Sequence, residues 1–236
     1  MLNKEKHQRI IGAILKDIYT NISISSLLGF KGGTCAYLFY DLPRFSVDLD
    51  FDLLAFDAPA SERILEEISH ITSVYGKVME QRVKRYTIFL LLSYGKEDRN
   101  IKIEINTRRQ APNIRDQYEL KEYLGIPILV AKKEYCFTTK LVALTMRRVI
   151  AVRDVYDIYY FGKKLWDIDG EILNALTGKN VKEYLSDCIA VVQNIPDSGI
   201  LHGLGELLSN KEKAWVKQHL KAEVVFLLKT YQAASV

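Results

Sequence analysis

The sequence is poor in the residues that build disulfide frameworks and zinc sites. It has three cysteines among 236 residues, namely Cys35, Cys136 and Cys188, and no two of them form a Cys-x-x-Cys pair. The four histidines also lack the spacing of metal ligands. These shortages exclude a disulfide-stapled domain and argue against a structural zinc site.

Long apolar runs are scarce as well. No run approaches the roughly 20 apolar residues that a transmembrane helix needs. The first residues, Met1 to His7, are too polar for a secretory signal peptide. We therefore expect a protein of the cytoplasm with no membrane partner. The formal net charge of +4 is compatible with a nucleotide or nucleic-acid partner but does not require one.

The chain does have enough apolar material for a sizeable core, since 48% of its residues are hydrophobic and 26% are charged. Its periodicity changes near the middle, from mixed helix and strand spacing to helical spacing alone. Helices are expected at 4–19, 35–42 and 61–75, and strands at 27–31, 47–54, 77–85, 86–94 and 100–106. Asp57–Ser61 is a helix-start signal, and residues 107–126 read as a polar, irregular excursion. Further helices are expected at 132–149, 151–163, 171–175, 181–193 and 211–231.

The pattern predicts the α+β class, with a mixed domain over residues 1–127 and a helical domain over residues 128–236. A chain of this length can form one large domain or two small ones. The helical region beyond the middle carries few motifs, and we assign no role to residues 165–236.

The most informative stretch is an alternation of acidic and apolar residues between Val47 and Leu53. Asp48, Asp50 and Asp52 alternate with apolar residues, which is the period of a β-strand with one carboxylate face. Like charges at this spacing are costly unless a cation neutralises them. By itself, an Asp-x-Asp pair is more often a solvated strand face, and Asp52 reads as a surface residue or a supporting partner.

A third carboxylate comes from the expected strand 100–106, where Glu104 alternates with isoleucines. If the two strands are neighbours, Asp48, Asp50 and Glu104 converge on one face. Such oxygen ligands suit Mg²⁺, which takes a few carboxylates together with waters and substrate phosphates. The three acids are therefore our predicted metal ligands.

A small-residue turn precedes the acidic strand. Gly32, Gly33 and Thr34 stand where a strand gives way to a helix, and Thr34 can cap that helix. Backbone N–H groups at a helix start suit a triphosphate. With Arg44 and Ser46 nearby, the parts describe nucleotidyl transfer from an NTP, with phosphodiester hydrolysis as the neighbouring reaction.

The order of these motifs resembles that of the AbiEii/AbiGii-type nucleotidyltransferases, the toxins of type IV toxin–antitoxin pairs. The resemblance rests on Gly-Gly-Thr followed by Leu42–Phe51, on the Ile103–Ile105 strand, on Lys140–Arg147, and on Arg153-Asp154 with Asp157. It covers roughly residues 25–162. Thr34 stands where relatives often have Ser, and Glu104 where many have Asp, so hydroxyl and charge are kept.

The resemblance implies a polymerase-β-like nucleotidyltransferase core followed by a C-terminal helical bundle. Asp48 and Asp50 would bind Mg²⁺, and Glu104 would be the third acid and could help to deprotonate the attacking hydroxyl. Gly32, Gly33 and Thr34 would hold the nucleotide phosphates, which Arg44 and Ser46 would touch unless they brace the strand. Lys140 would pair with a phosphate, and Asp157 would orient it or contact the acceptor.

The resemblance further implies an acceptor at the tRNA 3′ end or in another RNA, and a cognate antitoxin. Two alternatives stay open: an NTP-binding or antitoxin-binding module without turnover, and nucleotidyl transfer to protein hydroxyls.

Overall fold

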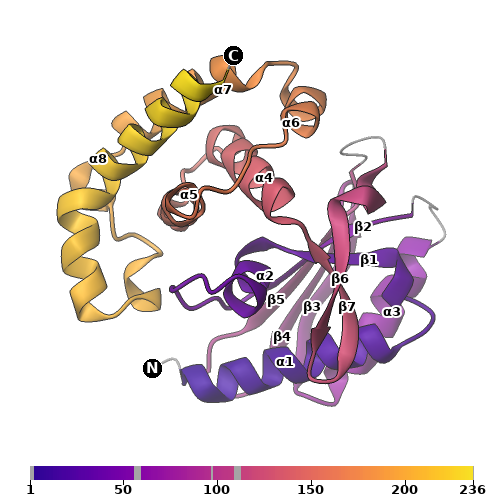
Figure 1. Cartoon of the computed structure of the whole chain (residues 1–236). Helices are drawn as coiled ribbons and strands as arrows, with labels where there is room; N and C mark the ends of the chain where they lie inside the picture. Colours follow the sequence, from indigo (N-terminus) through magenta and orange to yellow (C-terminus); the bar gives the residue numbers. More distant parts are fainter. Residues whose placement is uncertain (1–2, 56–59, 97, 109–112, 236) are drawn as a thin grey trace. The chain divides into compact units, whose positions relative to one another are not determined.

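The computed structural model describes residues 3–55, 60–96, 98–108 and 113–235. The chain divides into two compact units, Met1–Lys132 and Lys133–Val236. The first holds all the strands of the described sheet, and the second is helical (Figure 1). This is the expected α+β class.

The first unit is organised around a seven-stranded mixed sheet in the order β3-β4-β5-β2-β1-β7-β6. Two of its neighbouring pairs are parallel, β2 with β5 and β1 with β7, and the other pairs are antiparallel. The strands are β1 (Leu28–Lys31), β2 (Leu49–Leu53), β3 (Lys77–Lys84), β4 (Thr87–Ser93), β5 (Ile101–Asn106), β6 (Tyr118–Tyr123) and β7 (Ile126–Ala131).

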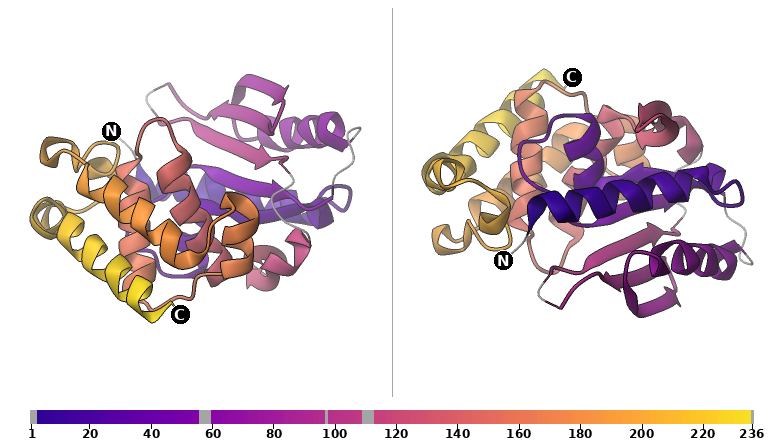
Figure 2. Two further views of the ribbon diagram at one scale, coloured as in Figure 1. Left: turned by 90° about the horizontal axis from the view of Figure 1, so that it is seen from above. Right: turned by 90° about the horizontal axis from the view of Figure 1, so that it is seen from below.

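In the described part of this unit, the sheet is accompanied by α1 (Lys4–Thr20), α2 (Gly32–Phe39) and α3 (Ala60–Ser73). α1 begins after Asn3, whose side chain accepts a hydrogen bond from the Lys6 backbone N–H at 3.0 Å. Its apolar stripe is buried, and the ring of Tyr19 meets that of Phe51 on β2. α1 also packs on α3 and β7, and Figure 2 shows it lying along the sheet in the view from below. The apolar residues of β2 therefore face this helical layer, and the alternating aspartates face the other way.

The expected strands at 77–85, 86–94 and 100–106 and the helix at 4–19 are confirmed with shifts of one residue at their ends. The irregular excursion expected over residues 107–126 is wrong in part, because residues 118–123 form β6. This strand pairs with β7 through a hairpin whose turn places Leu124 and Gly125 at positive φ. β6 is an edge strand with mostly polar, solvent-facing side chains, so it lacks a strong apolar alternation. The expected helix-start signal lies mostly outside the described residues.

The position of Thr34 also differs from the expectation. The helix begins at Gly32, so Thr34 is its third residue, and the N-cap is Lys31, whose side chain makes no capping bond. Gly32 has a φ of +79°, a conformation that glycine adopts without strain. This permits a helix start directly at the end of β1.

The α-helices of the second unit, in its described residues, are α4 (Lys133–Met146), α5 (Val152–Lys163), α6 (Gly170–Thr177), α7 (Val181–Gln193) and α8 (Asn210–Ala234). α4 packs on α5, α6 and α7, and α8 packs on α5 and α7. Within the described ranges, none of the helices combines the length and apolarity needed to cross a bilayer.

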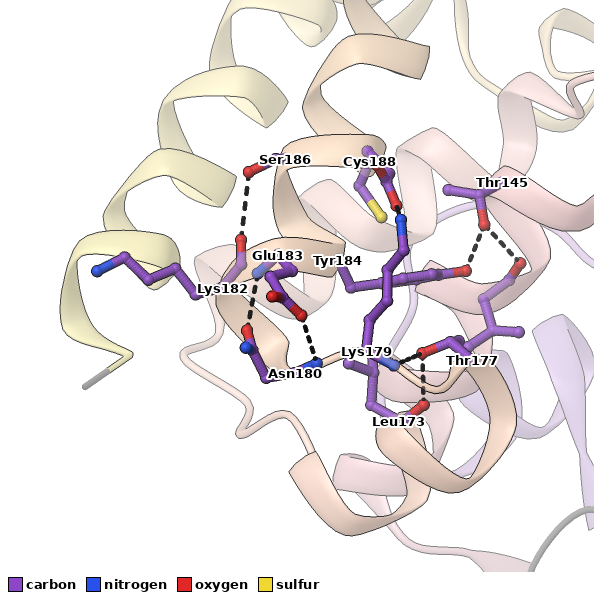
Figure 3. A network of polar contacts seen from close by, with 12 residues as sticks. Thr145, Leu173, Thr177, Lys179, Asn180, Lys182, Glu183, Tyr184, Ser186 and Cys188 are labelled. Carbon is purple, nitrogen blue, oxygen red and sulfur yellow. Dashed lines mark hydrogen bonds and ion pairs between the residues drawn. The ribbon is translucent and has the colours of Figure 1, made fainter.

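Local polar contacts hold the connection between α6 and α7 (Figure 3). Asn180 and Glu183 form a reciprocal capping box at the start of α7. The Lys179 ammonium lies 2.6 Å from the carboxylate of Asp187 on this helix. The Tyr184 hydroxyl hydrogen-bonds to Thr145, which ties α7 to α4. These contacts order the helices but bring together none of the predicted site residues.

Candidate functional site

The centre of the site is a pair of carboxylates on neighbouring parallel strands. Asp50 of β2 stands directly opposite Glu104 of β5. Neighbouring strands are about 4.8 Å apart, and side chains that stand opposite each other share a face. We call this side of the sheet, which carries Asp48, Asp50, Asp52 and Glu104, the carboxylate face. Both members of the central pair are partly accessible.

Asp52 belongs to the same face but has a different environment. It is 2% exposed and accepts hydrogen bonds from Lys31 at 2.5 Å, Asn106 at 2.8 Å and Tyr118 at 2.7 Å. Burial raises the pKa of this carboxyl, but the Lys31 ammonium and the three donors outweigh burial and hold the pKa below its ordinary value. Asp52 is therefore a buried structural anion. The expectation of a surface residue is wrong, and that of a supporting partner fits.

Asp48 lies just before β2 and is 9% exposed. Its carboxylate stands 3.4 Å from the Lys102 ammonium on β5. A partly exposed cation at this distance gives weak attraction and can exchange with another cation at little cost. Asp48 thus lies two residues before Asp50 and has a lysine as its charged neighbour.

The glycine turn comes against these acids. A Cβ atom on Gly32 would lie 2.4 Å from the Asp50 carboxylate, and one on Gly33 would lie 2.5 Å from the Arg44 guanidinium. Only glycines permit this approach of backbone to side chain. The first turn of α2 therefore presents backbone N–H groups and the positive end of its dipole beside the acidic pair, which suits a bound phosphate.

Thr34, Arg44 and Ser46 are buried around this turn. The Thr34 hydroxyl donates a short hydrogen bond to the Asp48 backbone carbonyl and lies 2.9 Å from the Ser46 hydroxyl. The Arg44 guanidinium donates to the Phe45 carbonyl at 3.2 Å. These contacts brace the turn against the chain leading into β2, so the two halves of the motif are fixed to one another.

A divalent metal fits this donor set in part. Among residues 3–55, 60–96, 98–108 and 113–235, no three His, Cys, Asp or Glu side chains are arranged to hold one ion together. The expected three-carboxylate cage is thus not assembled in this side-chain arrangement. Mg²⁺ commonly uses only one or two carboxylates plus substrate phosphates, and Asp50 with Glu104 would supply such a pair.

Lys140 and Asp157 are brought together in the second unit. The Lys140 ammonium on α4 lies 3.1 Å from Asp157 and 2.9 Å from Asp154, both on α5. The two aspartates are at most 1% exposed, and Arg147 approaches Asp154 at 3.2 Å. Burial raises the pKa of Asp154, but Lys140, Arg147 and Arg153 outweigh it and hold that pKa below its ordinary value. The cluster fixes the lysine side chain between two helices.

Two lysines of the first unit were missed from the sequence. Lys31 neutralises Asp52, and Lys102 approaches Asp48. Lys31 stands directly before the glycine turn at the end of a short strand, and Lys102 alternates with Glu104. Their alternation places them on the carboxylate face, but only the register shows which acid each one meets.

A mixed sheet with paired carboxylates on parallel neighbours, beside a glycine turn that opens a helix, defines a nucleotidyltransferase fold. Solved structures agree. A Helicobacter pylori protein provisionally described as a nucleotidyltransferase superposes with a TM-score of 0.59 at 18% identity, covering 98% of this chain and 95% of that one. The nucleotidyltransferase toxin MenT4 of Mycobacterium tuberculosis gives 0.58 at 19%, covering 97% and 88%. JHP933 from Helicobacter pylori gives 0.56 at 18%, covering 99% and 97%.

Residues 14–209 match the family described as the nucleotidyl transferase AbiEii toxin of type IV toxin–antitoxin systems. The chain belongs to this family. The structural likenesses, at these identities, show the shared fold. A search of curated proteins found no match. Membership supports nucleotidyl transfer with an NTP substrate, and a toxin of this kind has an antitoxin partner.

Proposed function

We propose that this protein transfers a nucleoside monophosphate from an NTP to a hydroxyl of an RNA acceptor, the 3′ end of tRNA, with Mg²⁺. The observation that supports this most directly is the position of Asp50, which lies opposite Glu104 and against the Gly32 backbone at the start of α2. Two carboxylates thus lie beside the backbone of a helix start, an arrangement that supports a role in binding metal and phosphate. Family membership supports the NTP, and the sequence resemblance supports the RNA acceptor.

In the proposed reaction, the acceptor hydroxyl oxygen forms a bond to the α-phosphorus, and the bond from that phosphorus to the β-phosphate oxygen breaks. Pyrophosphate leaves, and the hydroxyl proton passes to Glu104. The N–H groups of Gly32 and Gly33 hold the phosphates. Mg²⁺ held by Asp50 and Glu104, with Asp48 beside them, would neutralise negative charge on the phosphates.

The test uses α-³²P-labelled NTPs with Mg²⁺ and either total tRNA or total protein as acceptor. We expect label at the 3′ end of tRNA, loss of this label with a chelator, and no label with Asp50→Asn. Control reactions use Arg9→Ala, which removes an exposed charge on α1. Label on protein alone would reject the RNA acceptor and favour transfer to protein hydroxyls.

A second outcome would reject transfer itself. If the protein binds NTP in calorimetry but labels neither RNA nor protein, it acts as a binding module without turnover. Expression in a bacterial host tests the antitoxin. We expect the wild type to inhibit growth and Asp50→Asn not to inhibit it. Co-expression of the product of a neighbouring gene should restore growth of the wild-type strain if that product is the antitoxin.

A further inference from the structure

The exposed edge of the sheet beyond Glu104 is basic and aromatic. We call it the basic rim and define it by four cations, Arg82, Lys84, Arg85 and Arg108, with the rings of Tyr86 and Phe89. The four cations and Tyr86 are solvent-exposed, whereas Phe89 is 8% exposed and lies beneath Arg82 and Lys84. The six residues come from β3, from the turn after it, from β4, and from the segment after β5.

The rim continues the carboxylate face. Glu104 stands opposite Phe89 on β4, and Phe89 stands opposite Arg82 on β3. Directly opposite residues of paired strands share a face, so one row runs from Asp50 through Glu104 and Phe89 to Arg82. At about 4.8 Å per strand, this row covers about 14 Å from the acid pair to the sheet edge.

The cations of the rim lie over the aromatic rings. The Lys84 ammonium is 4.4 Å and the Arg82 guanidinium 5.7 Å from the Phe89 ring centre. Arg85 and Arg108 lie 5.0 and 4.9 Å from the ring of Tyr86. These are cation–π distances. Cations that track a backbone, combined with an exposed ring, are what proteins use to bind single-stranded nucleic acid.

Protection of the sheet edge is the simpler explanation of charge on β3, since β3 is an edge strand. Side chains of either charge, however, protect a sheet edge, and this protection does not require an exposed aromatic ring. Between residues 77 and 86 there are four basic residues and one acidic residue, Glu80. Glu80 pairs with Arg82 at 2.8 Å, but both side chains are well exposed and such a pair adds little stability. A phosphate can therefore compete for Arg82.

We propose that the basic rim binds the phosphates and bases of a single-stranded RNA and leads its end toward Glu104. The inference rests on the proposed function for the identity of the acceptor. Within it, Lys84 and Arg82 would contact phosphates, and Tyr86 would stack on a base. The acceptor hydroxyl would then reach the acidic pair along the row of the carboxylate face.

Binding is measured without NTP, by fluorescence anisotropy of a labelled single-stranded RNA of about ten nucleotides, a length within the usual range of such sites. The rim variant is Arg82→Ala/Lys84→Ala. The matched control is Arg9→Ala/Lys16→Ala, which removes one Arg and one Lys from exposed positions of α1. Size-exclusion chromatography shows whether the altered edge associates.

We expect the rim variant to bind the RNA about tenfold more weakly, with the slope of log affinity against log salt reduced by about 1.4, since each single-strand phosphate contact contributes about 0.7. Tyr86→Ala should weaken binding roughly five- to hundredfold without changing the slope, because stacking carries no charge. The control should bind as the wild type does.

Equal affinity of the rim and control variants would overturn the proposal. So would displacement of the RNA by an acidic peptide of equal charge at equal concentration, because the rim would then be a general anion surface. If the wild type binds RNA through the rim but transfers no label to it, the proposed function fails and the rim stands. If transfer to RNA occurs but the rim variant keeps its KM for RNA, only the rim fails; a raised RNA KM with unchanged NTP KM supports it.

Discussion

Asp50 and Asp52 stand two residues apart on β2, but we expect opposite consequences when each is replaced by asparagine. Asp52→Asn should destabilise the sheet, because the buried carboxylate accepts from Lys31, Asn106 and Tyr118. An asparagine has a single acceptor oxygen and adds a donor group to a site that already holds three. Asp50→Asn should leave the sheet intact, because removing one of two adjacent acids relieves repulsion with Glu104. It should abolish transfer, because the proposed Mg²⁺ site loses one of its carboxylates.

The magnitude follows from burial. Breaking a buried ion pair costs about 3–5 kcal/mol, because an uncompensated charge is left behind. The Lys31 side chain is 18% exposed and retains some contact with water, so we expect the lower end, about 3 kcal/mol. That corresponds to a roughly hundredfold increase in opening of the sheet.

The effect should depend on pH in a defined direction. The pKa of Asp52 is held below its ordinary value in the folded chain, so its stabilisation is present above about pH 4, the unfolded value. It is lost as the pH falls through the folded pKa. The difference in free energy of unfolding between the wild type and Asp52→Asn should therefore become smaller in acid.

Hydrogen exchange followed by mass spectrometry is the suitable assay. Both tryptophans, Trp166 and Trp215, belong to the second unit, so tryptophan fluorescence does not report on the sheet. Peptides that cover β1 and β2 should exchange about a hundred times faster in Asp52→Asn, in proportion to opening. The reasoning would be refuted if Asp52→Asn exchanged as slowly as the wild type, or if the difference in protection between them persisted in acid. Loss of protection in Asp50→Asn would refute the different roles assigned to the two aspartates.

Three further changes have expected outcomes. Gly32→Ala should cost about 1–3 kcal/mol and abolish transfer, because its positive φ strains alanine and the new Cβ meets Asp50; unchanged melting and activity would contradict this. Asp154→Asn should cost about 1.5–3 kcal/mol in urea unfolding followed by tryptophan fluorescence, since Lys140 and Arg147 lose a charged partner while Lys140 keeps Asp157. This cost should fade in acid, because the pKa of Asp154 is lowered, and a constant cost would count against it. Burial raises the pKa of Cys188 to about 12, so iodoacetamide at pH 8 should label it only after denaturation. Label on Cys188 of the native protein, detected by mass spectrometry, would contradict this.

Much of the site could be predicted from the sequence because its parts are local patterns. The alternation around Asp50 defined a strand with one acidic face, and the same period around Glu104 defined another. Two glycines before an apolar run indicated a tight turn into a helix. The sequence does not predict the strand at residues 118–123, because the exposed positions of this edge strand are polar and its apolar alternation is weak.

The sequence by itself therefore determined most of the elements, the faces of the acidic strands, and the presence of a glycine turn before them. Only the tertiary structure decided which side chains meet. Asp50 stands opposite Glu104 because β2 and β5 pair in parallel across some fifty residues of chain, and register between distant strands is not written in either strand alone. The same packing surrounds Asp52 with donors from three other segments, so two aspartates of one local pattern acquire different roles.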